Sequence, residues 1–182
     1  MSLYEQYNKI RPLSPHLADM VGDKKSIRIL DVGSGPYPIT GQQLDGVDVS
    51  IVWCDRKDFS DGWKRANDKP LFPIDVQDME LLTYPNESFD IVNCVNALDH
   101  TKGLLRAVLE MERVCKVGGH IYIDCSLNQL DTGHKHHWNA KADGTFDNHK
   151  EIIDLKKLGF TIRFIDLGGE SRYNHVIAIK QK

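Results

Sequence analysis

Four short, nearly continuous apolar runs recur along the chain: SIRILDV (26–32), DVSIVWCD (48–55), FDIVNCV (89–95) and GGHIYIDCS (118–126). Successive side chains of a strand point to opposite faces, so a run that is apolar almost throughout is apolar on both faces. Such strands are typical of a parallel sheet that is covered on both sides. The sequence therefore predicts a buried, mostly parallel sheet at the centre of the fold.

The segment between the third and fourth runs, 102–117, has the spacing of an amphipathic helix. Its apolar residues recur three and four positions apart, and Gly118 and Gly119 follow them. These apolar residues are Leu104, Leu105, Val108, Leu109, Met111, Val114 and Cys115. A strand, a helix and a second strand in succession form a βαβ unit with parallel strands. We expect the two glycines to end this helix.

A further helix is expected before the first strand. Ser14 is suited to the N-cap, Pro15 to the first helical position, and Gly22 to the end of the helix.

The C-terminal part of the chain has a different pattern. HKEIIDLKKLGF (149–160) is interpreted as a last helix ended by Gly159. TIRFIDL (161–167) and NHVIAIK (174–180) resemble strands, and the link between them is too short for a crossover helix. We therefore expect these two strands to pair antiparallel. The whole order predicts one α/β domain, a doubly wound Rossmann-like sandwich with a mostly parallel seven-stranded sheet and a C-terminal antiparallel hairpin.

Charge and composition limit the function classes. The 23 Lys and Arg residues against 26 Asp and Glu give a net charge of -3, and no basic block is present, which argues against a nucleic-acid partner. Four widely spaced cysteines without a C-x-x-C pair are typical of buried free thiols. No apolar stretch is long enough to span a membrane. We expect a cytoplasmic protein that does not bind membranes; its oligomeric state is not predicted.

The turn after the first run, DVGSGPYP (31–38), is the best candidate for a ligand site. In doubly wound sheets, ligands bind at the carboxyl ends of the strands, and glycines let a backbone approach a ligand closely. A dinucleotide-binding turn would have a third small residue at Pro38 and free amides for a pyrophosphate. Because Pro36 and Pro38 have no N–H, a nucleoside without a phosphate suits this turn better.

At this point the sequence resembles the class I S-adenosylmethionine-dependent methyltransferases of the small-molecule type (methyltransferase type 11-like). ILDVGSG (29–35) is similar to their first motif, LDxGxGxG. QDMELLTYPNESFDIV (77–92) resembles DAExLPFPDxSFDxV, and NALDHTKGLLRAVLEMERVCKVGGHIYI (96–123) resembles xLHHxxDxxxxLxExxRVLKPGGxxxI. The third glycine of the first motif is absent. The resemblance implies S-adenosyl-L-methionine as the cofactor.

The resemblance also implies roles for single residues. Asp31 would hold the methionine amino group, while Gly33, Ser34 and Gly35 would contact the cofactor through their backbone. Asn96 would contribute backbone to the pocket below the sulfonium.

A second set of residues would bind the adenosine. Two acids compete for the ribose hydroxyls: Asp48, and Asp55, which lies 20 residues beyond Gly35 and ends an apolar run. We favour Asp55, with Arg56 beside the adenine. Asp78 and Met79 match the acid and thioether that the family uses on adenine, and Asp75 is a rival for the acid. The residues predicted to bind the adenosine are therefore Asp55, Arg56, Asp78 and Met79.

The histidines are the candidates for proton transfer. Three readings stay open for the segment with His134, His136, His137 and Trp138: a general base with an aromatic wall for the acceptor, metal ligands, or a polar mobile loop. No Cys or acid at standard metal spacing accompanies these histidines, so no metal is expected. His137, His136 and then His100 are favoured as bases, and His100 could equally belong to the N-cap region of the next helix.

The predicted function is methyl transfer to an O or N atom of a small molecule, a glycan-type acceptor or an accessible group. A non-catalytic S-adenosylmethionine-binding module and an NAD(P)-dependent oxidoreductase are the alternatives. The single domain 1–182 would consist of an N-terminal helical cap (1–26), a cofactor-binding core (27–126), an acceptor-site insertion (127–147) and a C-terminal helix with the hairpin (148–182).

Overall fold

A computed structural model describes residues 9–36, 38–59, 73–127, 136–165 and 175–182. Along the chain the helical elements are α2 (Pro15–Val21), the 3-10 helix η1 (Leu98–His100) and α4 (Leu104–Val114). The strands are β1 (Ser26–Val32), β2 (Asp48–Asp55), β3 (Ile74–Val76), β4 (Phe89–Val95), β5 (Cys115–Ser126), β6 (Asn139–Ala140), β7 (Thr145–Asp147), β8 (Ile152–Asp154), β9 (Thr161–Ile165) and β10 (His175–Gln181).

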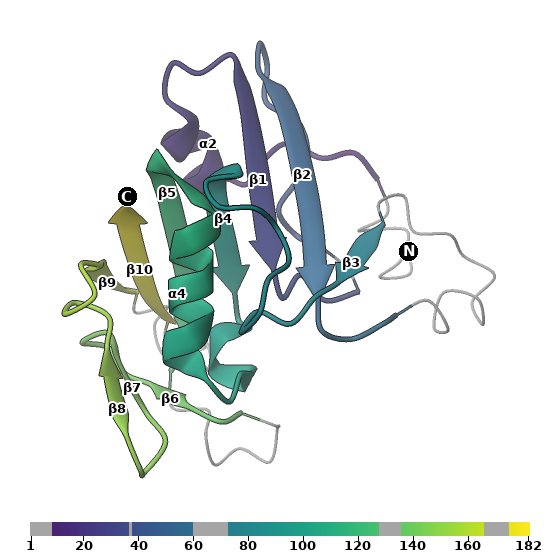
Figure 1. Cartoon of the computed structure of the whole chain (residues 1–182). Coiled ribbons are helices and arrows are strands. Elements are labelled where there is room, and N and C mark those ends of the chain that lie inside the picture. The colour runs from purple at the N-terminus through teal and green to yellow at the C-terminus, as the bar shows by residue number, and fades with distance from the viewer. Residues whose placement is uncertain (1–8, 37, 60–72, 128–135, 166–174) are drawn as a thin grey trace.

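The central sheet has seven strands in the order β3-β2-β1-β4-β5-β10-β9 (Figure 1). The first five of these strands run parallel, and β10 pairs antiparallel with both β5 and β9. The predicted fold class is therefore confirmed, including the antiparallel C-terminal hairpin. The order reverses at β1, so the carboxyl ends of β1 and β4 meet at the switch point where such sheets bind ligands.

Two separate apolar clusters cover the two faces of the sheet. Ile27 and Ile29 of β1 pack with α2, whereas Leu30 and Val32 of the same strand belong to the cluster that contains α4. Because side chains alternate along a strand, these clusters lie on opposite faces. The predicted N-terminal helix is confirmed, with Ser14 at the N-cap position and Pro15 at the first helical position.

The helix α4 is shorter than predicted. It ends at Val114, and Gly118 and Gly119 lie inside β5 rather than at a helix end. The reason is a close approach: a Cβ on Gly119 would lie 2.7 Å from the Asp90 carbonyl oxygen. Gly119 thus lets β5 lie against β4, a contact between two strands that the spacing of the glycines does not show.

The predicted helix over 149–160 is wrong, since residues 152–154 form strand β8 in a second sheet of order β6-β7-β8. Two side chains favour turns over a helix here. The Asn148 carboxamide oxygen accepts from the amides of residues 150 and 151, and the Asp154 carboxylate accepts from the amide of Lys156. Such local acceptors compete with the backbone carbonyls of a helix. Consequently 148–182 contains no helix within its described residues.

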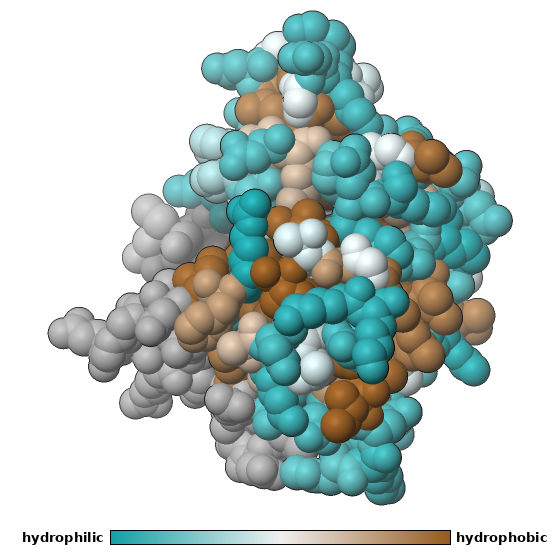
Figure 2. All heavy atoms as spheres, turned by 90° about the vertical axis from the view of Figure 1, so that its left-hand side faces the viewer, coloured by the Kyte–Doolittle hydropathy of each residue, from teal (hydrophilic) through white to brown (hydrophobic). Residues whose placement is uncertain are grey.

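The surface around this small sheet has both hydrophobic and hydrophilic side chains. Leu105 of α4, Ile152 of β8 and Phe164 of β9 are exposed, and hydrophobic patches alternate with hydrophilic ones on the face shown in Figure 2.

The four cysteines are free and buried, as the sequence predicted. No helix among the described residues is both long and apolar enough to cross a membrane.

Candidate functional site

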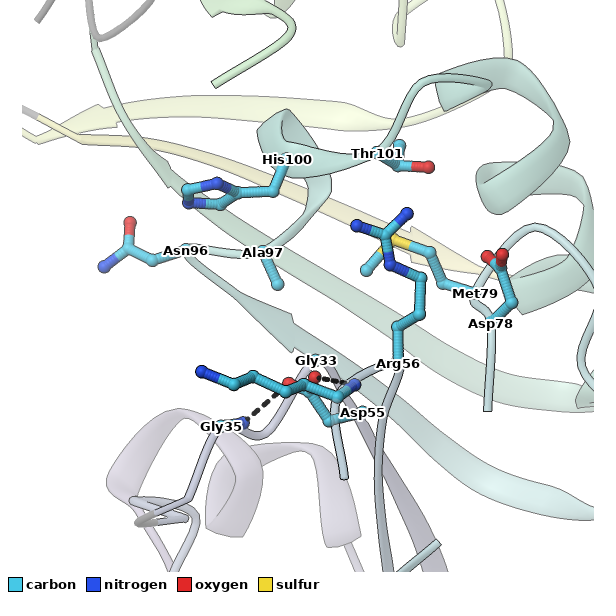
Figure 3. Close-up of a pocket in the computed structure, with 11 residues that line it drawn as sticks. Gly33, Gly35, Asp55, Arg56, Asp78, Met79, Asn96, Ala97, His100 and Thr101 are labelled. Atoms are coloured by element: carbon cyan, nitrogen blue, oxygen red, sulfur yellow. Dashed lines mark hydrogen bonds between the residues drawn. The ribbon is translucent and has the colours of Figure 1, made fainter. Parts of the chain in front are cut away.

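A cavity of about 560 Å³ opens at the carboxyl edge of the sheet, beside the switch point (Figure 3). Its walls come from the turn after β1, the end of β2, the turn after β3 and the segment that follows β4. The residues that line it are Gly33, Gly35, Asp55, Arg56, Lys57, Asp78, Met79, Asn96, Ala97, His100 and Thr101. Seven of these were predicted as cofactor-binding residues, and His100 as a candidate base.

The glycine turn uses its own amides to hold itself to β2. The amides of Gly33 and Ser34 donate to the Cys54 carbonyl oxygen at 2.8 and 3.0 Å, and the Gly35 amide donates to the Asp55 carboxylate at 3.1 Å. The prolines at 36 and 38 have no N–H to offer. No amide between 33 and 36 is therefore left to bind a pyrophosphate.

Gly33 is required by a close approach between two walls of the cavity. Its φ is +70°, and a Cβ built on it would lie 2.3 Å from the Cβ of Ala97 and 3.4 Å from the Cε of Met79. Gly35 also has a positive φ, of +63°, but a Cβ there would meet nothing within 4 Å. The first glycine thus brings the turn against the segment after β4, and the second leaves one wall of the cavity bare.

The two acids proposed for the ribose lie at opposite ends of β2. Asp55 ends the strand, lines the cavity and accepts from the amides of Gly35 and Lys57. Asp48 begins the strand, pairs in register with Ser26 and is exposed. A carboxylate offers about four acceptor positions, so Asp55 can accept further hydrogen bonds from a ligand. The geometry agrees with the preference for Asp55.

Asp78 and Met79 line the cavity from the turn after β3 (Figure 3). The Asp78 carboxylate accepts from the amide of Glu80 at 3.0 Å, which closes the turn that presents Met79. The rival acid, Asp75, accepts from the Tyr84 hydroxyl at 2.9 Å and is not part of the cavity wall. The pair favoured for the adenine is thus the pair that the fold places at the cavity.

Asp31 lies below the turn and does not line the cavity. It is 4% exposed, and its carboxylate accepts from the Asn93 side-chain amide at 2.7 Å and from the Thr40 hydroxyl. Burial raises its pKa to about 6, although both hydrogen bonds act to lower it. Its contact with the methionine amino group stays a prediction.

Asn96 has the positive φ of 48° and marks the sharp turn after β4. Its side-chain carboxamide oxygen accepts from the backbone amide and the hydroxyl of Ser126, both at 3.0 Å. Its backbone N–H donates to the carbonyl oxygen of Asp124. These bonds fix the turn, so the backbone at 96 and 97 can form part of the cavity wall. Sequence reasoning missed Lys57 and Thr101, which follow the predicted residues Arg56 and His100 directly in the chain.

Two of the three favoured histidines lie together. His100 lines the cavity, and its ring centroid is 4.2 Å from that of His136. His136 Nδ1 lies 2.6 Å from a carboxylate oxygen of Asp99. His137 does not line the cavity, and its amide donates to the Asp99 carbonyl oxygen. His134 lies outside the described residues.

Trp138 is not an aromatic wall of the cavity. Its side chain is 1% exposed, belongs to the core cluster around α4, and donates from Nε1 to the Thr101 carbonyl oxygen at 2.9 Å. The reason is that the indole buries its apolar ring in this core while its N–H finds an acceptor directly after η1. η1 itself is a separate helical turn and not the N-cap of α4, whose N-cap is Gly103.

Comparisons with known proteins agree with this geometry. A family model described as a methyltransferase domain matches residues 30–123. An uncharacterized methyltransferase of Schizosaccharomyces pombe is 31% identical over 111 residues, which are 54% of this chain and 39% of the relative. An uncharacterized protein of Methanocaldococcus jannaschii is 30% identical over 158 residues, 76% of this chain and 55% of the relative.

A crystal structure of a SAM-dependent methyltransferase from Methanosarcina mazei shares the fold. It covers 94% of this chain and 99% of that one, with a TM-score of 0.57 and 17% identity. The chain spans little more than half, or less, of the length of the two relatives matched by sequence. Since the matched region 30–123 runs from the end of β1 through β5 and includes every residue of the cavity wall, the chain belongs to the methyltransferase-domain family.

Proposed function

We propose that the protein transfers the methyl group of S-adenosyl-L-methionine to an O or N atom of a small molecule, a glycan-type acceptor or an accessible group of a larger one. Membership of the methyltransferase-domain family implies this cofactor. The single observation that supports the choice is the glycine turn. All three of its amides from Gly33 to Gly35 are used within the fold, so the site suits a nucleoside without a phosphate bridge.

The cavity residues fit an adenosine. In this proposal Asp55 accepts from the two ribose hydroxyls, because a carboxylate can accept two bonds from vicinal hydroxyls. Asp78 accepts from the exocyclic amine of adenine, and the thioether of Met79 packs on the ring. Arg56 and Lys57, also at the cavity, flank the base or lie near the entrance.

Below the turn, Asp31 supplies negative charge toward the cationic part of the cofactor. A buried carboxylate with a pKa raised to about 6 is stabilised in its ionised form by any cation that comes near it. Asn93 and Thr40 hold the orientation of that carboxylate.

Catalysis requires mainly positioning. When bound, the cofactor supplies a methyl group already activated by the sulfonium. The turns at Gly33 and Asn96 form fixed walls, so an acceptor can be held near attack distance, about 3 to 3.5 Å. His100 at the cavity, with His136 behind it, can accept a proton where the acceptor is an alcohol or phenol. His137 is less suited because it does not line the cavity.

Isothermal titration calorimetry tests the cofactor. We expect S-adenosylhomocysteine to bind and NADH not to bind, since the turn has no free amide for a pyrophosphate. Tight binding of NADH without binding of S-adenosylhomocysteine would favour an oxidoreductase. Methyl transfer from labelled S-adenosylmethionine across a panel of phenols, alcohols, amines and glycans then tests the reaction. Cofactor binding without transfer to any of them would favour a non-catalytic binding module.

A further inference from the structure

Three side chains of types that bind metal ions lie close together, and one of them, His100, lines the cavity. Asp99 and His100 lie on η1, and His136 lies on the segment before β6. Each offers one ligand atom, and the three atoms lie within 4.8 Å of one another. We propose that Asp99, His100 and His136 bind a divalent transition-metal ion.

Asp99 has a buried carboxylate oxygen without a hydrogen-bond donor among the described residues. It is 2% exposed, one of its carboxylate oxygens contacts His136, and the other, Oδ1, is buried and accepts no hydrogen bond from the described residues. A buried carboxylate is costly unless a charge or hydrogen bonds compensate it. A metal ion beside Asp99 would provide that compensation.

Backbone hydrogen bonds hold the two segments together in addition to the contact between the Asp99 and His136 side chains. The amides of His137 and Trp138 both donate to the Asp99 carbonyl oxygen, at 2.8 and 3.1 Å. The buried indole of Trp138 adds its bond to the Thr101 carbonyl oxygen. His136 is therefore fixed beside η1 by its neighbours, and preorganised ligands of this kind lower the cost of binding a metal ion.

The distances require only a small adjustment on binding. Metal–nitrogen and metal–oxygen bonds to such ligands are about 2.0 to 2.2 Å, so two ligand atoms of one ion are at most about 4.4 Å apart. The ligand atoms here lie within 4.8 Å, and a side-chain rotation of His100, which is exposed, can close the difference. Asp99 and His136 are already in contact at 2.6 Å.

The donor set indicates which ions are suitable. Two imidazoles and one carboxylate suit Zn²⁺, Co²⁺, Mn²⁺ or Fe²⁺ better than Mg²⁺ or Ca²⁺, which prefer oxygen ligands. Three protein ligands leave at least one coordination position open. Because His100 lines the cavity, that position can receive an oxygen or nitrogen atom of the methyl acceptor, a role that rests on the proposed function. In the metal-bound protein His100 is then a ligand and not the proton acceptor.

The test uses chelator-treated protein without cofactor and follows Co²⁺ by its visible absorption and Zn²⁺ by calorimetry. We expect one equivalent of metal in the wild type. His100→Gln, His136→Gln and Asp99→Asn should each weaken binding about tenfold or more, since changes even in the outer shell of metal sites cost 10- to 100-fold. His137→Gln is the matched control, because His137 is adjacent in sequence and outside the cluster.

The proposal would be overturned if the wild type binds no metal. It would also be overturned if the His100 and His136 substitutions weaken metal binding no more than His137→Gln does. Circular dichroism and thermal denaturation, measured on every variant, show whether the fold is intact, and His100→Gln keeps the test valid if Asp99→Asn does not fold. Failure of the proposed function can be distinguished from failure of the metal site, because it would appear as absent S-adenosylhomocysteine binding in the metal-free wild type.

Discussion

The two carboxylates at the ends of β2 offer the sharpest test of how this fold would hold adenosine. Asp55 lies at the cavity and Asp48 at the start of the same strand, about 23 Å away if each residue adds about 3.3 Å. We compare Asp55→Asn with Asp48→Asn. Each change removes one charge and keeps the size of the side chain.

The expected magnitude follows from the hydrogen bonds that Asp55 would make. A bond to a charged group contributes roughly 1.5–3 kcal/mol, about twice a neutral one. Two ribose hydroxyls would then lose about 2–3 kcal/mol together, which weakens binding about 30- to 150-fold. An asparagine oxygen can still accept from the Gly35 amide at the position where Asp55 does so at 3.1 Å, so the turn should stay folded.

Calorimetric titration with S-adenosylhomocysteine measures both variants, and thermal denaturation checks their folding. Asp48→Asn should bind within about twofold of the wild type, since Asp48 is exposed and outside the cavity wall. Unchanged affinity in Asp55→Asn, or a large loss in Asp48→Asn, would refute the assignment of the ribose site to the end of β2.

Three further predictions concern the turn and two carboxylates. Gly33→Ala should destabilise the fold by about 1–3 kcal/mol, because the new Cβ would lie 2.3 Å from the Cβ of Ala97. Gly35→Ala should destabilise it less, because only the positive φ of residue 35 disfavours a side chain there. Urea denaturation compares the two variants, and an equal loss of stability would contradict the close approach at Gly33. Because burial raises the pKa of Asp31 to about 6, the folded state binds its proton more tightly than the unfolded one. Its contribution should therefore fall as the pH rises from about 4 to about 6, by up to about 3 kcal/mol, and Asp31→Asn should abolish that slope; an unchanged slope in the variant would exclude Asp31 as its source. For Asp90, burial acts to raise the pKa, but hydrogen bonds from Lys116, the Arg28 amide and Lys24 outweigh it and lower the pKa to about 2. The stability that these bonds contribute should be present above pH 4 and disappear as the pH falls toward 2. Asp90→Asn should weaken this loss of stability at low pH in denaturation curves, and an unchanged loss in the variant would contradict the assignment to Asp90.

Much of the sheet could be predicted because its strands carry a local signal. A strand buried on both faces must be apolar almost throughout, and β1, β2 and β4 are. Because their carboxyl ends meet at one edge, the sequence alone indicates that Asp55 and Asn96 lie near the glycine turn.

The C-terminal region could not be read in the same way. Ile152, Ile153, Leu155 and Leu158 have spacings that suit a helix as well as a strand followed by a turn. The decision came from Asn148 and Asp154, which accept from nearby amides, and from β7, which provides the partner for β8. The partner residues are only five to nine positions away, but each of the two strands has three residues, which is too short a run for a recognisable strand pattern.

The sequence by itself determined which residues are apolar, where the backbone lacks N–H groups and which acid follows each strand, and these local properties were sufficient for the sheet and most of the cavity wall. Only the tertiary structure decided that Asp99 and His100 lie against His136, 37 residues away from Asp99. The neighbouring Trp138 joins the same two segments, since its indole is buried and donates to the Thr101 carbonyl oxygen. Packing between distant segments has no period along the chain, so no spacing of residues could have shown it.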